Sequence, residues 1–329
     1  MGDRLRFAMR RMLLRLLTAI QLTRLTMAFG AVSDVWFVIL YTRAENQAGV
    51  TVTEMPLAGA LLAGAVVAVG LFAYGAALND VLDVRHDSAF SPDRPLPAGR
   101  IRVGQAIVVV VGALMVAVVG GNALGPWALR ITLITAAGIL FYNAAARYIP
   151  SVGLVTIGLI HAAHMLIPNH LMPFMLPVWL VMTHAMAIGI AVHVLEDKRP
   201  RLDTRAIIGI VCGWLTWSGI LLTLGVIRDD SIWPRELSAI NLLVPACAVI
   251  GFVIVAWWKS SGVTAIVAAE KLKRYGAMWQ SLYGAAWLCS LRHVSESIWI
   301  GILALAGFAA MTLIKEITGG LAGRPVTYR

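Results

Sequence analysis

The chain has 329 residues, of which 59% are hydrophobic and only 13% are charged. A soluble domain carries roughly twice that charged fraction, so the composition excludes an ordinary soluble protein. The formal net charge of +10 does not call for a nucleic-acid partner, because basic loops on one side of a membrane, facing anionic lipid, account for it.

Nine apolar runs recur along the chain, most of them near the roughly 20 residues that cross a hydrocarbon core as a helix. They are rich in Ala, Gly, Leu and Val and lack strict alternation, so they favour helices over a barrel. The runs are Leu25–Thr42, Met55–Leu78, Val103–Leu129, Ile131–Ala146, Tyr148–Pro168, Pro173–Leu195, Ala206–Ile227, Leu237–Trp258 and Ser297–Ile314. We therefore predict an all-α integral membrane protein, a single domain over residues 1–329 with nine transmembrane helices.

The segments between the runs differ in charge, and this difference predicts the orientation. Basic residues gather at Arg4–Arg24, Arg85–Arg102, Arg147, Lys198–Arg205 and Lys259–Arg274, which face one side if the helices simply alternate. Under the positive-inside rule that side is cytoplasmic. We therefore expect a multi-pass protein of the cell (inner) membrane with its N-terminus inside and its C-terminus outside.

Two polar segments are predicted to lie along the membrane rather than across it. Met1–Arg15, within an N-terminal segment of residues 1–20, is basic and amphipathic, which favours a surface helix over a disordered tail. The longest polar interval, from Lys259 to about Gln280, suits a short interfacial helix.

The second apolar run ends in a cluster of acidic residues. Asn79, Asp83 and Asp87 are four residues apart, so on a helix they lie along one face, with Asp80 at its edge. Clustered carboxylates repel one another unless a cation or a basic partner neutralises them. Mg²⁺ accepts such oxygen ligands together with substrate phosphates. The alternative is a merely solvated helix end, but Asn79 in the column and the loop Arg94–Pro97 after it favour a metal–phosphate site.

The pattern Asn79-Asp80-x-x-Asp83-x-x-x-Asp87, followed by Asp93–Arg100, resembles the first signature of the UbiA superfamily of intramembrane prenyltransferases. The resemblance implies a nine-helix bundle of that type, with aspartate motifs on helices 2 and 6 near the cytoplasmic face. It also implies transfer of an isoprenyl group from an allylic diphosphate to an aromatic or lipid acceptor, with Mg²⁺ as the cofactor.

The same resemblance assigns roles to individual residues. Asn79, Asp80, Asp83 and Asp87 are expected to bind Mg²⁺-diphosphate, with Asp83 and Asp87 essential for catalysis. The expected substrate-binding partners around them are Arg24, Arg85, Arg94, Tyr142, Asn143 and Arg147. Arg147 also fits an ordinary basic residue of the cytoplasmic side, and Arg94 also fits a loop residue paired with Asp93.

The second signature departs from the family pattern. Two aspartates four apart are expected on helix 6, but this chain has His193 and Asp197 at that spacing. Imidazole is a poor ligand for Mg²⁺, which prefers oxygen. Glu196 therefore substitutes as a ligand together with Asp197, or the second metal is held differently, or His193 contacts diphosphate or acts as a base. Lys198 and Arg199 either supply positive charge there or mark the cytoplasmic side.

Further polar residues lie inside apolar runs, where burial is costly and function is the default expectation. Asp34 is expected to orient the acceptor or to pair with a histidine. His161 and His164 share one helix face, with His170 nearby, and either ligate a metal or haem or bond between helices. Because no acid is near them in sequence, interhelical bonding or cavity lining is favoured.

Three functions remain open at this point. The prediction is a prenyltransferase that acts on an isoprenyl diphosphate and a hydrophobic acceptor in membrane lipid, without nucleic acid. The alternatives are a terpene cyclase of the same fold, which needs no acceptor, and a non-enzymatic membrane protein that binds a lipid or cofactor. The altered second motif supports both alternatives, and the histidines support the last.

Overall fold

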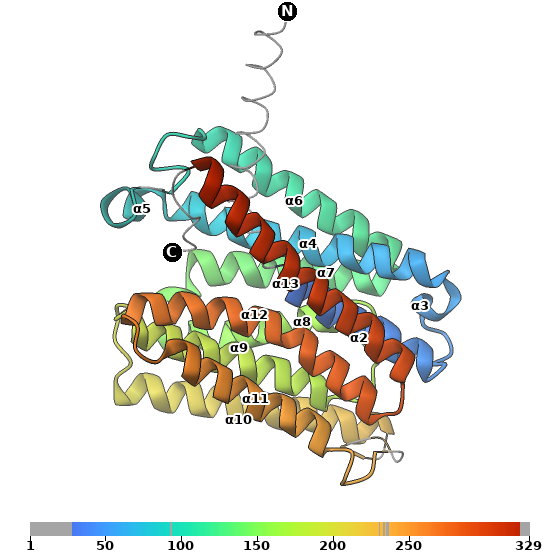
Figure 1. Cartoon of the computed structure of the whole chain (residues 1–329). Coiled ribbons are helices and arrows are strands. Elements are labelled where there is room, and N and C mark those ends of the chain that lie inside the picture. The colour runs from blue at the N-terminus through green and yellow to red at the C-terminus, as the bar shows by residue number, and fades with distance from the viewer. Residues whose placement is uncertain (1–27, 93, 230, 233, 235–236, 323–329) are drawn as a thin grey trace, which may run out of the picture.

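The computed structural model describes residues 28–92, 94–229, 231–232, 234 and 237–322, and these residues form helices and connecting turns without a strand (Figure 1). Ten of the helices have 16 or more residues: α2 (Phe29–Ala44), α4 (Leu57–Leu82), α6 (Val103–Ala123), α7 (Pro126–Ala144), α8 (Pro150–Met165), α9 (Leu176–Leu195), α10 (Thr204–Asp229), α11 (Leu243–Ser260), α12 (Ala265–Ser290) and α13 (Val294–Ala322). Three short elements join them: α3 (Thr51–Glu54), α5 (Val84–Phe90) and η2 (Ala146–Tyr148). The predicted all-α fold is confirmed, while the predicted N-terminal surface segment lies outside the described residues.

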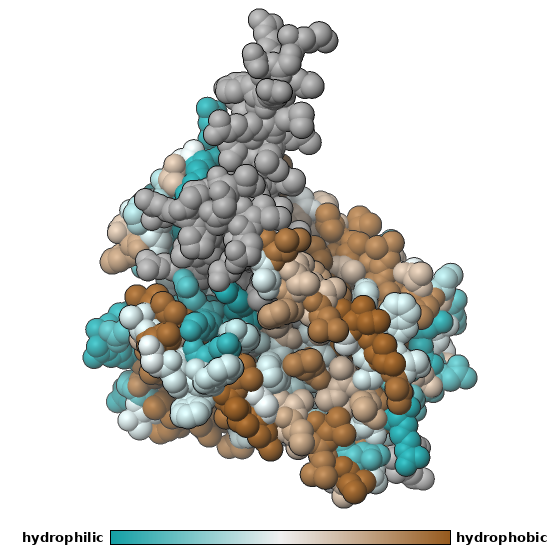
Figure 2. Space-filling view, in the orientation of Figure 1, coloured by the Kyte–Doolittle hydropathy of each residue, from teal (hydrophilic) through white to brown (hydrophobic). Residues whose placement is uncertain are grey.

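The helices are built to face lipid. Six of those described, α4, α6, α7, α9, α10 and α11, are long and apolar enough to cross a membrane. Large apolar side chains also cover the outside of the bundle; Leu215 of α10 and Ile250 of α11 are 56% and 57% exposed. Figure 2 shows such side chains across the visible flank. A surface of this kind is expected to be solvated by lipid rather than water, so the chain is a multi-pass membrane protein.

Close backbone contact fixes α4, the helix whose end carries the acidic residues. Gly70 of α4 faces the backbone of Ala117 in α6, where an added Cβ would lie 2.5 Å from the amide nitrogen. Gly120 of α6 faces the backbone of Val67 in the same way, at 2.6 Å. Small residues at such positions let membrane helices approach closely and gain van der Waals contact. Any side chain at Gly70 or Gly120 would therefore push the two helices apart.

The helix α2 lies between two apolar clusters and is buried on both faces. Val35 and Ile39 belong to a cluster with residues of α4, α6 and α7, whereas Phe37 and Tyr41 belong to one with residues of α8, α9 and α12. All four side chains are at most 2% exposed. The two halves of the bundle are thus held together through α2.

The interval from Lys259 to Gln280, predicted to be a short interfacial helix, instead covers the end of α11, a turn and the first part of α12. It contributes to α12, which packs against α2, α9, α11 and α13. Tyr283 and Trp287 in its second half are 2% and 6% exposed. The charges of α12 lie in its first turns, where Lys273 pairs with Glu196 at the end of α9. Hydropathy alone missed this helix because those charges lower its average.

The additional helix reverses the direction of the last one. The "motif end" of the bundle is here the end at which α4, α7 and α9 finish, and α12 begins there. The next turn lies at the opposite end, where His293 bonds Glu45 (2.7 Å) just beyond α2. Helix α13 then runs back toward the motif end (Figure 1). The count of nine helices is therefore not confirmed for the described residues, which form ten helices of 16 or more residues. The last of these helices runs toward the motif end, whereas the sequence predicted an end on the opposite side.

Labelling of single cysteines distinguishes the two arrangements. In a variant without Cys212, Cys247 and Cys289, we expect Ser91→Cys and Ser261→Cys to react with an impermeant thiol reagent from the same side of the membrane. Ser295→Cys is expected to react only from the other side, because α12 separates it from Ser261. Reaction of Ser295→Cys from the same side as Ser261→Cys would contradict this arrangement and support the interfacial helix predicted from the sequence.

Candidate active site at the motif end

An arginine from a distant part of the chain binds the first half of the acidic column. Arg147, in η2, donates from Nη1 to Oδ1 of Asn79 (3.1 Å) and to Oδ2 of Asp83 (2.8 Å). Its Nη2 donates to the other oxygen of Asp83 and to the hydroxyl of Tyr148 (2.9 Å). A guanidinium bound to a carboxylate through two nitrogens is both strong and directional. The two partners are 64 residues apart, so tertiary structure rather than local spacing assembles this pair.

The second half of the column pairs with a different arginine. Nη1 of Arg94 lies 2.6 Å from Oδ2 of Asp87 and 3.7 Å from Oδ1 of Asp80. Both carboxylates are buried, and the arginine side chain is only 21% exposed. The predicted cluster therefore exists, and each of its three carboxylates lies close to a guanidinium.

Local sequence explains how Arg94 reaches the column. The helix is interrupted at Asp83, between α4 and α5, but backbone bonds from Asp83 to Asn79 (2.9 Å) and from Asp87 to Asp83 (2.8 Å) keep the helical spacing. The chain then folds back through a proline-containing turn, and Leu96 anchors it in the apolar cluster around α4. The predicted single face over two turns is thus confirmed with one break.

The guanidinium of Arg147 keeps its positive charge within this site. Burial alone lowers the pKa of Arg147, but its hydrogen bonds to Asp83 and Tyr148 outweigh burial and raise it, so the guanidinium stays charged. The Nε atom of Arg147 is buried and has no hydrogen-bond partner among the described residues. An unsatisfied buried donor is costly, which is consistent with a site completed by an anionic ligand.

The arrangement of oxygens indicates what kind of metal binding fits. Within the described part of the chain, no three His, Cys, Asp or Glu side chains gather as a metal-ligand cluster. The oxygens converge in pairs instead: Asn79 and Asp83 on Arg147, and Asp80 and Asp87 on Arg94. Mg²⁺ commonly takes one or two carboxylates and completes its shell with water and substrate phosphate. These pairs fit Mg²⁺ that arrives with diphosphate, and they do not fit a metal held by protein alone.

The other residues predicted to bind the substrate differ in burial and in their contacts. Asn143 is buried, and its Nδ2 donates to the carbonyl of Ile139 in its own helix (2.9 Å). Tyr142 is half-buried beside it, whereas Arg85 is exposed. Arg24 and Asp93 lie outside the described residues. The predicted alternative partner of Arg94 is therefore not described, while Asp87 is bonded to it directly.

The second motif forms a separate group of contacts. The buried His193 ring uses Nε2 to donate to the carbonyl of Pro200 (2.9 Å), which ties the end of α9 to the loop after it. Asp197 is 62% exposed and binds Arg201 (3.0 Å) and Arg199 (3.6 Å). Hydrogen bonding to Arg201 holds the pKa of Asp197 below its usual value.

Glu196 has stronger partners than Asp197. It pairs with Lys198 (3.1 Å) and with Lys273 of α12. Burial raises the pKa of Glu196, but these two ammonium groups outweigh burial and leave that pKa below its usual value. None of the recorded bonds between described residues joins this second motif to the acidic column. Both groups nevertheless lie at the motif end, as predicted.

A third polar group lies inside the bundle between α8, α9 and α12. Gln280 donates from Nε2 to Nδ1 of His161 (3.2 Å), and His184 donates from Nε2 to the carbonyl of Gly276 (3.0 Å). The other nitrogen of His184 must then accept, so Tyr283 donates its hydroxyl to Nδ1 (3.2 Å). His161 therefore makes an interhelical hydrogen bond, one of the two roles favoured for it from the sequence. The partners on α12 were missed, because that helix was not predicted to enter the bundle.

The remaining intramembrane polar residues have no such network. Nε2 of His164 and Oδ2 of Asp34 are buried without a hydrogen-bond partner among the described residues. His170 lies in the turn before α9 at the opposite end, where its ring stacks on Trp127 with centroids 4.7 Å apart. His170 is therefore separate from both motifs.

The bond between Tyr283 and His184 gives a stability prediction. Tyr283→Phe leaves a buried imidazole acceptor unpaired, so we expect the free energy of unfolding to fall by about 1 kcal/mol, within the range for interhelical bonds in membranes. The midpoint of thermal unfolding in detergent measures this loss. Tyr275→Phe is the matched control, because Tyr275 lies on the same helix, is more exposed and has no recorded hydrogen bond. Equal midpoints for the two variants would contradict the prediction.

Solved structures share the fold. A structure of digeranylgeranylglyceryl phosphate synthase aligns with 83% of this chain and 97% of its own, at 20% identity and a TM-score of 0.52. A UbiA homologue from Aeropyrum pernix K1 aligns with 80% of this chain and 97% of its own, at 15% identity and a TM-score of 0.55. At these identities the likeness concerns the fold alone.

Similarity in sequence to characterised relatives is local. A digeranylgeranylglyceryl phosphate synthase of Saccharolobus solfataricus is 37% identical over 89 residues, which is 27% of this chain and 31% of that protein. One from Methanosarcina barkeri is 31% identical over 84 residues, 26% of this chain and 29% of that protein. The chain thus matches less than a third of the length of these relatives. The model of the UbiA prenyltransferase family, by contrast, matches residues 35–282, about three-quarters of the chain and all of the acidic column, so the chain belongs to the UbiA prenyltransferase family.

Proposed function

We propose that the protein transfers an isoprenyl group from an allylic diphosphate to a hydrophobic acceptor within the membrane. The observation that carries this proposal is the pairing of a buried acidic column with Arg147 and Arg94 at the end of an apolar bundle. In the reaction the bond between the allylic carbon and the diphosphate oxygen breaks, and diphosphate leaves with the electron pair. The acceptor forms the new bond to the carbon and releases a proton.

The chain's own groups suit this chemistry. Asn79, Asp80, Asp83 and Asp87 supply the oxygens that would hold Mg²⁺, and Mg²⁺ would neutralise the leaving diphosphate. Arg147 and Arg94 are then available to the phosphate oxygens, where preorganised positive charge stabilises the developing anion. The apolar interior keeps water away from the allylic cation.

The remaining predicted residues take supporting roles in this proposal. Arg24, Arg85, Tyr142 and Asn143 contact the diphosphate or the acceptor in this proposal. Asp34 orients the acceptor deeper in the bundle, where its free carboxylate oxygen is buried.

The second motif is proposed to close the other side of the site. Glu196 and Asp197 contribute oxygens, while His193, Lys198 and Arg199 support the diphosphate. With His193 in place of an aspartate, this motif does not need a second Mg²⁺ held by protein groups alone. Lys198 and Lys273 already place positive charge beside Glu196.

The choice of acceptor rests on the relatives that match part of the chain. The relatives that match part of this chain are named for a phosphorylated glycerol with two geranylgeranyl groups. A lipid acceptor with a phosphorylated glycerol is therefore our first choice over an aromatic acceptor.

The test is turnover by the purified protein in lipid nanodiscs with Mg²⁺ and allylic diphosphates of increasing chain length. Each diphosphate is offered with a phosphorylated glycerol lipid, with an aromatic acid, or with no acceptor, and the products are identified by mass spectrometry. A prenylated acceptor is expected. A cyclised hydrocarbon without acceptor would instead indicate a cyclase, and unchanged diphosphate under all conditions would indicate a binding protein.

A further inference from the structure

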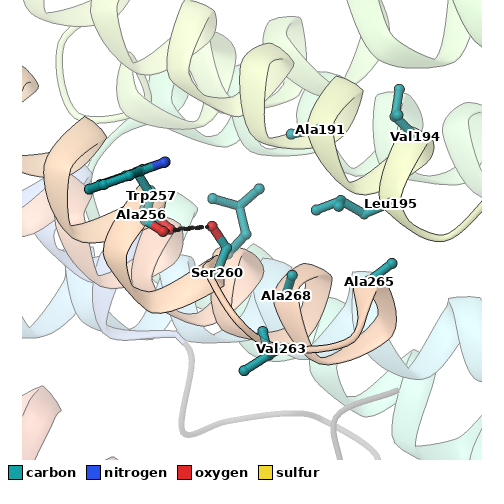
Figure 3. Close-up of a pocket in the computed structure, with 10 residues that line it drawn as sticks. Ala191, Val194, Leu195, Ala256, Trp257, Ser260, Val263, Ala265 and Ala268 are labelled. Atoms are coloured by element: carbon teal, nitrogen blue, oxygen red, sulfur yellow. Dashed lines mark hydrogen bonds between the residues drawn. The ribbon is translucent and has the colours of Figure 1, made fainter.

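A groove with a volume of about 620 Å³ lies at the motif end, between the last turns of α9 and α11 and the first turns of α12 (Figure 3). Its lining includes Ala191 and Leu195 from α9, Ala256 and Ser260 from α11, and Ala268 from α12. Figure 3 shows the α9 side chains on one side and those of α11 and α12 on the other. None of the lining residues belongs to the acidic column or to the second motif, although the groove lies beside the turn of α9 that carries His193.

The lining determines what part of a ligand the groove can hold. Nine of its ten residues are Ala, Val, Leu or Trp, and the tenth is Ser260. The Ser260 hydroxyl already donates to the carbonyl of Ala256 in its own helix (2.6 Å). No polar group is left to bind a head group inside, so the interior suits a hydrocarbon chain.

The rim of the groove is basic. Lys271 donates from Nζ to the carbonyl of Lys259 (3.0 Å), which places its ammonium beside the end of α11 next to Ser260. No carboxylate of the described residues lies within ion-pair distance of Lys271. On the α9 side, Lys273 and Lys198 share the single carboxylate of Glu196. Lys271 thus makes the α11 side of the opening basic, and Lys273 and Lys198 add positive charge at the nearby end of α9.

Aromatic residues place this opening at the surface of the membrane. Trp257 and Trp258 at the end of α11 are 72% and 65% exposed, and the Lys259 ammonium lies 4.3 Å from the Trp258 ring centroid. Exposed tryptophans beside lysines are typical of helix ends at the level of lipid head groups. Basic pockets between membrane helices at that level bind anionic lipid head groups.

We propose that this groove binds an anionic phospholipid of the surrounding membrane, with one chain against Leu195 and Ala268 and its phosphate held by Lys271 and Lys273. The cationic rim selects an anionic lipid over a zwitterionic one, because only the anionic head group carries net negative charge. The bound chain packs against the last turn of α9, which carries His193 and ends at Glu196. The lipid therefore restricts the turn that presents the second motif.

The experiment compares two lipids that differ only in head group. The full-length protein is purified in detergent and incubated with phosphatidylglycerol or phosphatidylcholine of identical chains, and retained lipid is counted by native mass spectrometry. We expect selective retention of phosphatidylglycerol. Lys271→Gln should weaken this retention about fivefold, the effect of one cationic side chain near an anionic lipid surface. Arg130→Gln is the matched control, because Arg130 stacks on Trp127 at the opposite end (4.4 Å).

A second pair of variants separates the groove from general lipid contact. Ala256→Trp fills the groove and should abolish the selective retention, whereas Ala246→Trp lies exposed at the other end of α11 and should leave it unchanged. Equal retention of both lipids by the parent would overturn the proposal, as would full retention by Ala256→Trp. Competition by free glycerol phosphate at the same concentration as lipid would show that the rim binds phosphate without a chain, which would also overturn it.

Discussion

Asp83→Ala is expected to lower the rate of prenyl transfer by about 100-fold or more, the loss seen when one preorganised group of a charge-stabilising site is removed. The substitution removes an oxygen that would hold Mg²⁺-diphosphate. It also releases Arg147, which is bound to both oxygens of Asp83. The measurement is the initial rate at saturating allylic diphosphate over a series of Mg²⁺ concentrations.

Control variants make this loss interpretable. Glu54→Ala removes an exposed carboxylate at the opposite end of the bundle and should keep the parent rate. Asp197→Ala should cost less than Asp83→Ala, because Asp197 is mostly exposed and its two arginine partners lie in the same loop. A thermal unfolding midpoint near that of the parent shows that Asp83→Ala remains folded. A rate within a few-fold of the parent would mean that the acidic column serves the structure and does not bind Mg²⁺-diphosphate.

The acidic column was predictable because its information is local. Asn79, Asp83 and Asp87 are four residues apart, and the helix keeps that spacing through the break at Asp83. The bond between Arg147 and Asp83 is different. It joins residues 64 apart through the packing of α4 and α7, and no spacing rule reaches that far. Arg147 was proposed from the family resemblance alone, and an ordinary basic residue of the cytoplasmic side was an equally good interpretation.

The helix α12 shows where hydropathy fails. Its first turns carry Lys271, Lys273 and Arg274, and these charges lower the mean hydropathy of the segment despite the apolar residues that follow. Its buried polar residues, Gln280 and Tyr283, lower the average further, although their partners are histidines of α8 and α9. A polar residue satisfied by another helix looks the same in one sequence as a polar residue in water. Only tertiary structure separates the two cases.

The second motif lies at the end of α9, but its partners were not predictable. Glu196 pairs with Lys273, which is 77 residues away on the helix that hydropathy missed. The hydrogen bond between His193 and Pro200 is local, yet no pattern in the sequence favours it over a contact with metal or diphosphate. In the structure His193 holds the loop after α9 through this bond, a role that was not among those predicted from the sequence.

His193→Asp is expected to lower the rate of prenyl transfer by more than tenfold, and the structure sharpens the reason. Nε2 of His193 donates to the carbonyl of Pro200, and an aspartate at this place has no proton to donate. Its carboxylate would also add negative charge next to the diphosphate. At an effective dielectric near 20, two unit charges about 4 Å apart interact by roughly 4 kcal/mol. Even part of this repulsion would therefore lower the rate by more than tenfold.

A matched substitution separates the holding role from a role as metal ligand. His193→Gln keeps an N–H donor at nearly the same reach, so it should retain most of the activity if His193 holds the loop after α9. If His193 instead stands in for a lost metal ligand, His193→Asp restores an oxygen and should work faster at lower Mg²⁺ than the parent. Initial rates against Mg²⁺ concentration for the parent and both variants decide between the two. Limited proteolysis of the Lys198–Thr204 loop, faster in His193→Asp than in His193→Gln, would show that the lost bond, and not only the added charge, loosens this side of the site.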